Sequence, residues 1–226
     1  MNLLILGRGK TGALVAEIAR ERRHQVRVVA SAENQDCAAL TSEKLSGVDV
    51  VIDFTTPAAA FDNIEACIEA RKSLVVGTTG WYEKLPIIKA QVETTGVGFL
   101  YGANFSVGVN LFFDVARAGA AALKQEYQGR IFERHHVHKK DAPSGTAAML
   151  QRVIRDASKS DLEITSFREG DVVGMHEVIL DSPNDTIYLC HDAKSRRGFA
   201  EGAVKGAEWL AGKRGFFDFR DVWREL

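Results

Sequence analysis

Basic side chains are concentrated in residues 133–146, which read ERHHVHKKDAPSGT. Three histidines and two lysines fall within six consecutive positions of this segment. A histidine such as His135 exchanges protons near neutral pH, and a lysine such as Lys139 can donate a proton or neutralise developing negative charge. We therefore take His135 and Lys139 as candidate acid–base residues. They would suit a hydride transfer, which also requires a proton.

The same segment runs into a predicted helix. Ser144 precedes an apolar periodic run, so we expect it to be the N-cap of that helix. The backbone N–H groups of Gly145 and Thr146 would then be free at the positive helix end, where they could bind a carboxylate. Gly145 also has no side chain to crowd a ligand. A basic loop followed by an anion-binding helix start predicts a small acidic substrate.

Other interpretations of this segment stay open. His136 and His138 could bind a metal ion, but the neighbouring lysines would repel a cation, so we expect no metal. A solvated basic loop is a further alternative. Asp141 could cap the helix entry or orient Lys139. If the chain stays extended beyond His135, the alternation of a strand places His135 and Lys139 on the same side.

A glycine loop near the start of the chain is the second candidate site. Residues 7–12 read GRGKTG, which fits G-x-G-x-x-G between a predicted strand and a predicted helix. A nucleoside-triphosphate loop would need a glycine where Leu4 stands, so we expect a dinucleotide instead. The residues expected to contact it are Gly7, Arg8, Gly9, Lys10, Thr11 and Gly12.

Two more loops follow predicted strands at the same edge of the sheet. Residues 53–57 read DFTTP, and residues 77–80 read GTTG. Ligands bind at the carboxyl ends of strands in such sheets, so we expect Gly77, Thr78 and Thr79 to contact the cofactor.

The sequence leaves the choice between NADH and NADPH open. The acid that usually holds the adenosine ribose is not obvious after the second strand, and Glu33 comes slightly late. Arg8, Lys10 and Ser31 could accept a 2′-phosphate, or they could be solvated surface groups.

Strand-like and helix-like patterns alternate through the first half of the chain. Strands are predicted at residues 2–6, 25–30, 48–54, 73–76 and 97–101, with helices at 11–22, 58–72 and 84–94. This order predicts an α/β fold with a Rossmann-like, doubly wound parallel sheet.

A different pattern follows in the second half. Helices are predicted at residues 108–125 and 144–158, and strands at 129–136, 162–168, 174–181 and 185–191. These elements suggest a second α+β domain with an open mixed sheet, followed by a helix at 199–210 that returns to the first domain. We expect a dinucleotide-binding domain of residues 1–104 plus 198–226, and a substrate-binding and oligomerisation domain of residues 105–197.

Composition excludes several classes of protein. The chain has 226 residues and a net charge of −1, so no broad basic field is present to bind nucleic acid or an anionic membrane. No apolar segment approaches the roughly 20 residues needed to cross a bilayer, and the N-terminus does not resemble a signal peptide. Three widely spaced cysteines, Cys37, Cys67 and Cys190, favour reduced thiols in a cytoplasm.

Residues 133–146 resemble the signature of the dihydrodipicolinate reductase family, which is close to E-x-H-H-x-x-K-x-D-A-P-S-G-T. Other segments that resemble this family are residues 53–55, 77–80, 104–109, 197–203 and 217–222. The resemblance implies reduction of 4-hydroxy-tetrahydrodipicolinate, a small dicarboxylate, with NADH or NADPH in lysine and diaminopimelate biosynthesis. It also implies a cytoplasmic homotetramer built through the sheet of the second domain.

The resemblance also implies roles for individual residues. His135 resembles the family's proton donor and acceptor, and Lys139 its proton donor. His136, Gly145 and Thr146 resemble substrate contacts. Cofactor contacts are implied for the loops already described and also for Gly102, Ala103, Asn104 and Phe105.

The chain departs from the family at two places near the cofactor. Family members commonly have G-x-x-G-x-x-G at the first loop, whereas this chain has the shorter form. The segment at residues 31–47 is also short. Both departures concern cofactor preference and affinity more than substrate chemistry.

Two alternative functions remain at this point. The chain could be another two-domain nicotinamide enzyme, such as an imine or amino-acid dehydrogenase, or a non-catalytic dinucleotide sensor. Arg196 and Arg197 lie at the second expected hinge, where they could contact cofactor or substrate or form a salt link between domains.

Overall fold

The computed structural model describes residues 1–226, which divide into two compact units. The first unit consists of Met1–Ser106 and Arg197–Leu226, and the second of Val107–Arg196. The boundaries expected from the sequence, after residue 104 and before residue 198, fall next to these positions. The roles assigned to the two units remain predictions.

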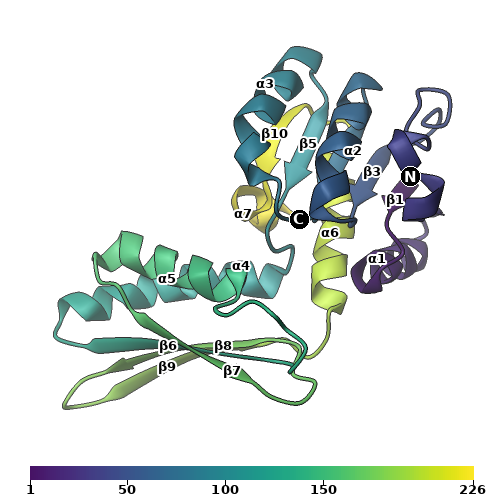
Figure 1. Ribbon diagram of the computed structural model, residues 1–226. Coiled ribbons are helices and arrows are strands. Elements are labelled where there is room, and N and C mark those ends of the chain that lie inside the picture. The colour runs from purple at the N-terminus through teal and green to yellow at the C-terminus, as the bar shows by residue number, and fades with distance from the viewer. The chain divides into compact units, whose positions relative to one another are not determined.

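The first unit is built on a parallel sheet of six strands in the order β10-β5-β4-β3-β1-β2 (Figure 1). The strands are β1 (Asn2–Leu6), β2 (Gln25–Val29), β3 (Val50–Asp53), β4 (Ser73–Val76), β5 (Gly98–Tyr101) and β10 (Gly215–Asp218). The central strands β1, β3 and β4 are almost entirely buried, so they are continuous apolar runs rather than alternating patterns.

Helices pack against this sheet as α1 (Lys10–Glu21), α2 (Pro57–Glu69), α3 (Leu85–Thr95) and α6 (Arg197–Leu210), followed by the short α7 (Phe219–Val222). Helix α1 packs on α6, which crosses β3, β4 and β5, while α2 packs on α3. Leu4, Val51 and Phe99 belong to the core shared with α2 and α3. The predicted doubly wound α/β class is confirmed.

The chain reverses its direction across the sheet at β1. It passes from β1 to β2 on one side and then returns to β3 on the other. Backbone hydrogen bonds continue past the strand ends, from Gly7 N–H to the Val29 carbonyl (2.9 Å) and from Phe54 N–H to the Leu6 carbonyl (3.0 Å). Open α/β sheets bind their ligands at such a reversal, beyond the carboxyl ends of the strands.

Strand β10 was not predicted from the sequence. It has four residues, too few to display a strand period, and it pairs only with β5 at the edge of the sheet. Its partners are far away in the chain, with Gly215 opposite Gly98. The strand therefore depends on tertiary pairing rather than on a local pattern.

The second unit contains a mixed sheet, as the sequence predicted, and its strand order is β7-β6-β8-β9 (Figure 1). Its strands are β6 (Gln128–His135), β7 (Glu163–Arg168), β8 (Met175–Asp181) and β9 (Thr186–Asp192). β6 and β7 are parallel, and the other pairs are antiparallel. The helix predicted at residues 108–125 is α4 (Val107–Gly119), extended by a 3₁₀ segment, Ala120–Lys124.

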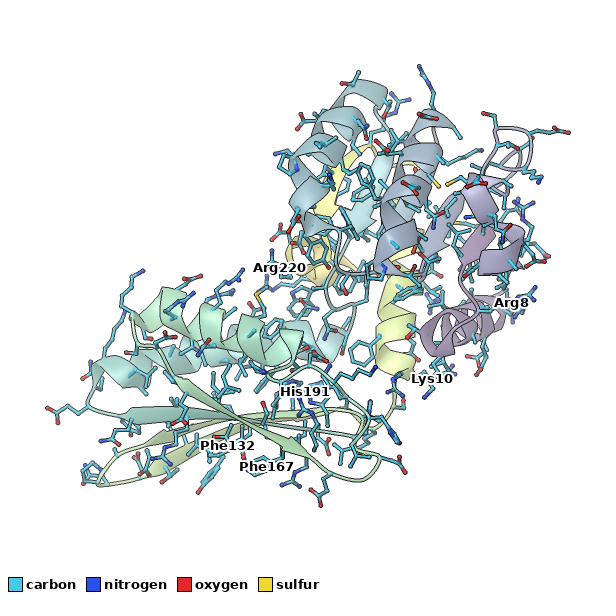
Figure 2. All side chains as sticks on the ribbon, in the orientation of Figure 1. Arg8, Lys10, Phe132, Phe167, His191 and Arg220 are labelled. Carbon is cyan, nitrogen blue, oxygen red and sulfur yellow. The ribbon has the colours of Figure 1, made fainter.

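Helices α4 and α5 (Gly145–Ser158) cover one face of this sheet. Ile131 and Val178 form a buried core there with Phe112 and Leu150. Phe132 and Phe167 lie on the opposite face with their rings stacked, 6.3 Å between centroids (Figure 2). No helix of the chain is long and apolar enough to span a membrane.

Candidate active site

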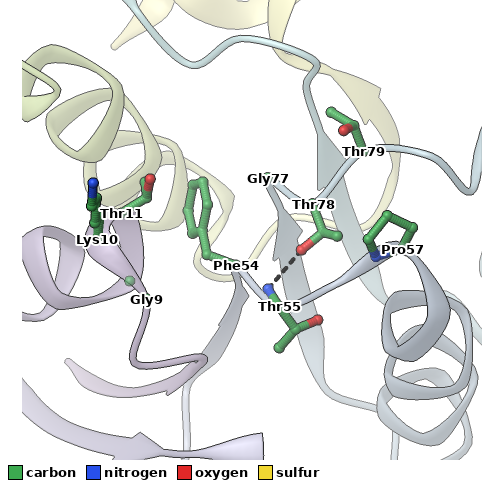
Figure 3. Close-up of a pocket in the computed structure, with 10 residues that line it drawn as sticks. Gly9, Lys10, Thr11, Phe54, Thr55, Pro57, Gly77, Thr78 and Thr79 are labelled. Atoms are coloured by element: carbon green, nitrogen blue, oxygen red, sulfur yellow. Dashed lines mark hydrogen bonds between the residues drawn. The ribbon is translucent and has the colours of Figure 1, made fainter. Parts of the chain in front are cut away.

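A cavity of about 320 Å³ lies at the carboxyl ends of β1, β3 and β4 in the first unit (Figure 3). It is lined by Gly9, Lys10, Thr11, Gly12, Phe54, Thr55, Pro57, Gly77, Thr78 and Thr79. The structure therefore brings together the three loops that the sequence analysis singled out. The other expected cofactor residues, at positions 7, 8 and 102–105, do not line this cavity.

The three glycines of the first loop have different functions in the fold. Gly7 has a φ of +101°, and a Cβ atom there would lie 2.2 Å from the Phe54 carbonyl oxygen. A Cβ atom on Gly12 would lie 2.2 Å from the Gly7 carbonyl oxygen. A Cβ atom on Gly9 would meet nothing within 4 Å. Gly7 and Gly12 are thus required by packing, whereas Gly9 keeps space open where α1 begins.

This open space fits a dinucleotide phosphate. Helix α1 starts at Lys10, with Gly9 as its N-cap and no side chain capping it. The N–H groups in the first turn of a helix have no partner within the helix, and they carry positive partial charge. They can therefore bind the pyrophosphate of a dinucleotide.

The buried carboxylate of Asp53 holds two loops that line the cavity. Asp53, the last residue of β3, is fully buried and accepts hydrogen bonds from the Thr55 N–H (2.9 Å) and the Thr78 hydroxyl (2.6 Å). The Thr78 hydroxyl oxygen accepts from the Thr55 N–H (2.7 Å), as Figure 3 shows. Asn63 of α2 donates to the second carboxylate oxygen (2.8 Å). These bonds tie the loops after β3 and β4 to each other.

An ion pair stands near the end of β2, where an adenosine ribose is expected. Arg8 lies 3.4 Å from Glu33, and both side chains are more than half exposed. The 3₁₀ turn Ser31–Glu33 returns the Glu33 carboxylate to the strand end, where it accepts from Ala30 N–H (2.8 Å). An acid suits ribose hydroxyls and an arginine suits a phosphate, so this pair is compatible with NADH and with NADPH.

The loop after β5 contributes packing. The Phe105 ring is buried against Phe54 and Phe219, with centroids 6.2 and 4.6 Å away. A Cβ atom on Gly102 would lie 2.9 Å from the Phe219 Cβ. The Asn104 side chain accepts a hydrogen bond from the Ser106 N–H (2.9 Å). Because the Phe105 ring is buried in this packing, a ligand could contact Phe105 only through its backbone.

The second unit centres on the buried carboxylate of Glu133, on β6. Glu133 is fully buried and accepts from the Ser144 N–H (3.1 Å to each oxygen) and from the Ser166 hydroxyl (2.7 Å). The Arg168 guanidinium donates to it at 3.2 Å. Burial alone would raise the pKa of Glu133, but the hydrogen bonds from Ser144, Ser166 and Arg168 outweigh it and lower the pKa below its usual value. Glu133 is therefore ionised.

His135 lies two residues beyond Glu133 on the same face of β6. It is 7% exposed, and its Nδ1 atom is 3.3 Å from the Glu133 carboxylate. Burial lowers the pKa of His135, the Glu133 charge partly offsets this, and the charges of Lys139 and Arg168 lower the pKa further. His135 is thus a neutral imidazole at neutral pH.

Lys139 reaches the site through a turn and not along a strand. β6 ends at His135, residues 137–138 form a turn, and Lys139 N–H donates to the His136 carbonyl (3.1 Å). The extended continuation beyond His135 considered above is therefore wrong. Lys139 Nζ is 2.9 Å from Asp141, and this hydrogen bond is the main cause that lowers the pKa of Asp141. Asp141 orients Lys139.

The predicted helix start is confirmed. Ser144 is the N-cap of α5, and its hydroxyl oxygen accepts from Ala147 N–H (3.1 Å). A Cβ atom on Gly145 would meet nothing within 4 Å, so the space in front of the helix is open. Gly145 is exposed and Thr146 is partly exposed. This end of α5 can receive a carboxylate.

The two arginines at the second expected hinge have different partners. Arg196 lies 3.2 Å from the Nε2 atom of His136. Arg197 forms ion pairs with Glu17, Glu21 and Glu201, all in the first unit.

Glu133, His135 and His176 form a cluster whose possible metal-ligating atoms all lie within 4.8 Å of one another. These residues are not the His136 and His138 pair that the sequence analysis considered as possible metal ligands. The Arg168 guanidinium already neutralises the carboxylate, and a second cation beside it would be repelled. We therefore interpret the cluster as two imidazoles packed around a hydrogen-bonded Glu133 carboxylate.

Sequence reasoning missed Ser166, Arg168 and His176 as parts of the site. Strand register places Ser166 and His176 on either side of Glu133, from β7 and β8. No local motif marks them. The one available signal was the two-residue spacing of Glu133 and His135, which puts a carboxylate and an imidazole on the same face of a strand.

Comparisons with known proteins cover almost the whole chain. The family "Dihydrodipicolinate reductase, N-terminus" matches residues 1–105, and "Dihydrodipicolinate reductase, C-terminus" matches residues 108–223. The 4-hydroxy-tetrahydrodipicolinate reductase of Christiangramia forsetii is 36% identical, over 100% of this chain and 99% of the relative. The enzyme of the same name from Chromobacterium violaceum is 38% identical over 79% of this chain and 74% of the relative.

A solved structure shares the fold. The dipicolinate-bound dihydrodipicolinate reductase from Paenisporosarcina sp. TG-14 has a TM-score of 0.81 and 22% identity, and it covers 98% of this chain and 99% of its own. This chain therefore shares with that reductase its fold, a six-stranded parallel sheet with helices and a second, mixed sheet.

The glycine loop generates a first prediction. Gly9→Ala should fold as stably as the wild type, because the new methyl group meets nothing, yet it should weaken binding of a nicotinamide dinucleotide by about tenfold or more because it occupies the space in front of α1. Gly12→Ala should lower the melting temperature, because its methyl group overlaps the Gly7 carbonyl. Thermal unfolding and calorimetric titration measure both effects. Equal cofactor affinity in Gly9→Ala and wild type would contradict the assignment.

Proposed function

The chain belongs to the dihydrodipicolinate reductase family, and from this premise we propose that it reduces 4-hydroxy-tetrahydrodipicolinate to tetrahydrodipicolinate with NADH or NADPH. This reaction is a step of lysine and diaminopimelate biosynthesis. The observation that carries the proposal is the arrangement of the second unit, where Lys139, His135 and the open start of α5 are built around Glu133.

The substrate is a small dicarboxylate, and the second unit offers groups to bind it. The N–H groups of Gly145 and Thr146 receive one carboxylate at the start of α5. The cationic Lys139 and the His136 ring, steadied by Arg196, add contacts to the anion.

Lys139 and His135 divide the proton chemistry. Reduction of a conjugated imine adds a hydride and a proton, and loss of the 4-hydroxyl group releases water. Lys139 is a charged donor held by Asp141, so its Nζ atom supplies a proton to the substrate. His135 is neutral with Nδ1 facing Glu133, so Nε2 is the atom that exchanges protons. Gly174 leaves that atom uncrowded, because a Cβ atom there would lie 3.0 Å from Nε2.

The nicotinamide cofactor, when bound, supplies the hydride. The residues that would hold it are those lining the cavity of the first unit, with its pyrophosphate in front of Gly9 and the start of α1. The pair of Arg8 and Glu33 would meet the adenosine ribose. The backbone of residues 102–105 would complete the contacts.

A coupled assay tests the proposal. Dihydrodipicolinate synthase generates the unstable substrate in the cuvette, and oxidation of NADH and of NADPH is followed side by side. We expect oxidation that depends on the synthase. No oxidation of either cofactor, with dinucleotide binding intact, would favour a non-catalytic sensor. Oxidation with other imines or oxo acids, but not with this product, would favour a different dehydrogenase.

Lys139→Ala should lower kcat by roughly 10²–10⁴, which is the usual effect of losing a positioned acid. Dinucleotide affinity should be unchanged, because Lys139 lies in the second unit. Lys140→Ala is the matched control, since it removes the adjacent, exposed lysine. Near-normal turnover of Lys139→Ala, or equal losses in both variants, would contradict the role given to Lys139.

We further propose that the enzyme is a cytoplasmic homotetramer assembled through the uncovered face of the β7-β6-β8-β9 sheet. This face carries Phe132 and Phe167 (Figure 2). The strand register places Tyr188, which is 65% exposed, on the same face. Apolar side chains gathered on a face that no helix covers are typical of an interface.

Phe167→Asp should convert the tetramer into smaller species, because it places a charge in that interface. Ile87→Asp is the control, since Ile87 is an equally exposed apolar residue of α3 in the first unit. Light scattering coupled to size-exclusion chromatography measures both masses. A monomeric wild type, or a Phe167→Asp variant that remains tetrameric, would contradict the proposal.

A further inference from the structure

His176 is buried beside the site but takes no part in the proton transfer or substrate contacts proposed above. It lies on β8, is 4% exposed, and stands opposite Glu133 in the strand register. The same register places Ser166 on the other side of Glu133 and His191 beyond His176. Four polar side chains therefore occupy one row across the sheet, where aliphatic residues would normally fill a core.

One nitrogen of His176 makes its polar contacts. Nε2 is 3.2 Å from the Ser144 hydroxyl oxygen and 3.8 Å from the Glu133 carboxylate. Nδ1 is buried and has no hydrogen-bond partner. The ring also meets His135 edge to face, with centroids 5.2 Å apart. The ring is thus placed so that Nε2 meets the N-cap of α5, while Nδ1 is left unsatisfied.

We propose that His176 is a positioning residue of the reductase site. Its Nε2 atom fixes the Ser144 hydroxyl, and through it the N–H groups of Gly145 and Thr146 that receive a substrate carboxylate. This inference rests on the proposed function, because it gives α5 the task of binding the dicarboxylate.

The contact with Ser144 is one of three that define the start of α5. The Ser144 N–H is held by Glu133, and its hydroxyl oxygen accepts from Ala147 in the first turn. The hydroxyl also lies 3.2 Å from His176 Nε2 within the buried site, and this contact helps to set its position. A misplaced Ser144 would turn the first N–H groups of the helix away from the anion.

His176 performs this function as a neutral group. Burial lowers the pKa of His176 to about 4. Repulsion from His135 and His191, once they are protonated, and from Lys139 acts in the same direction, against the Glu133 carboxylate. A neutral ring adds no charge that would compete with Arg168 and the Ser144 N–H for Glu133. It can also exchange a hydrogen bond with a hydroxyl in either direction.

Two amide substitutions separate the roles of the ring nitrogens. Glutamine places its amide near the position of Nε2, whereas asparagine reaches only to that of Nδ1. We expect His176→Gln to keep the affinity for dipicolinate, used as a stable dicarboxylate probe, within about threefold of the wild type. His176→Asn should lose roughly tenfold, as for one hydrogen bond to an anchored group. The KM for the synthase product should follow the same order.

Further measurements exclude a merely structural effect. The dinucleotide affinity of both variants should equal that of the wild type, and kcat should change less than KM. His191→Asn is the matched control, because it alters the neighbouring imidazole of the same row, which packs on Phe112 and not on Ser144. It should leave dipicolinate affinity unchanged. A glutamine variant that binds no better than the asparagine variant, or an equal loss in His191→Asn, would overturn the inference.

The outcome is distinguishable from a failure of the proposed function. If the wild type does not reduce the synthase product, the proposed function fails, while the dipicolinate titrations still compare the two amides. If the wild type is active and both His176 variants bind dipicolinate normally, the inference about His176 fails alone.

Discussion

The buried carboxylate of Glu133 organises the second unit. A carboxylate in an apolar interior is costly unless it is paired and fully hydrogen-bonded, and here the Ser144 N–H, the Ser166 hydroxyl and the Arg168 guanidinium satisfy it. These donors come from β7 and from the residue that begins α5. Glu133 therefore holds the loop of residues 136–144 against the sheet, which places Lys139 and the start of α5 beside His135.

The first unit also contains a buried, hydrogen-bonded carboxylate near the end of a strand. Asp53 ends β3 as Glu133 nearly ends β6, and it too is fully buried and accepts hydrogen bonds from loop residues, here Thr55 and Thr78. In both units a buried acid at or near a strand end holds a neighbouring loop in place through hydrogen bonds, and these loops form the rim of the site. We propose that the ligand-binding groups on that rim are mainly backbone N–H groups at helix starts, at Lys10 in α1 and at Gly145 in α5.

Local patterns in the sequence were sufficient for much of this arrangement. The glycine loop, the N-cap at Ser144 and all strands but β10 follow from spacing and periodicity over a few residues. The turn that brings Lys139 to the site was not predicted, since nothing in the sequence ends β6 at His135. Ser166, Arg168 and His176 depend on strand register between distant segments. The chemistry of the basic segment made His135 and Lys139 candidate acid–base residues, and the family resemblance implied a specific role for each.

An ionised Glu133 stands beside two neutral imidazoles, and the arrangement of the site depends on these charges. Nuclear magnetic resonance titration of the wild type, with labelled carboxyl and imidazole groups, measures all three ionisation states in one experiment. At pH 7 the account predicts a charged Glu133, a neutral His135 and a neutral His176 that gains its proton only near pH 4. A protonated Glu133, or a His176 that titrates near its ordinary pKa of about 6.5, would contradict it.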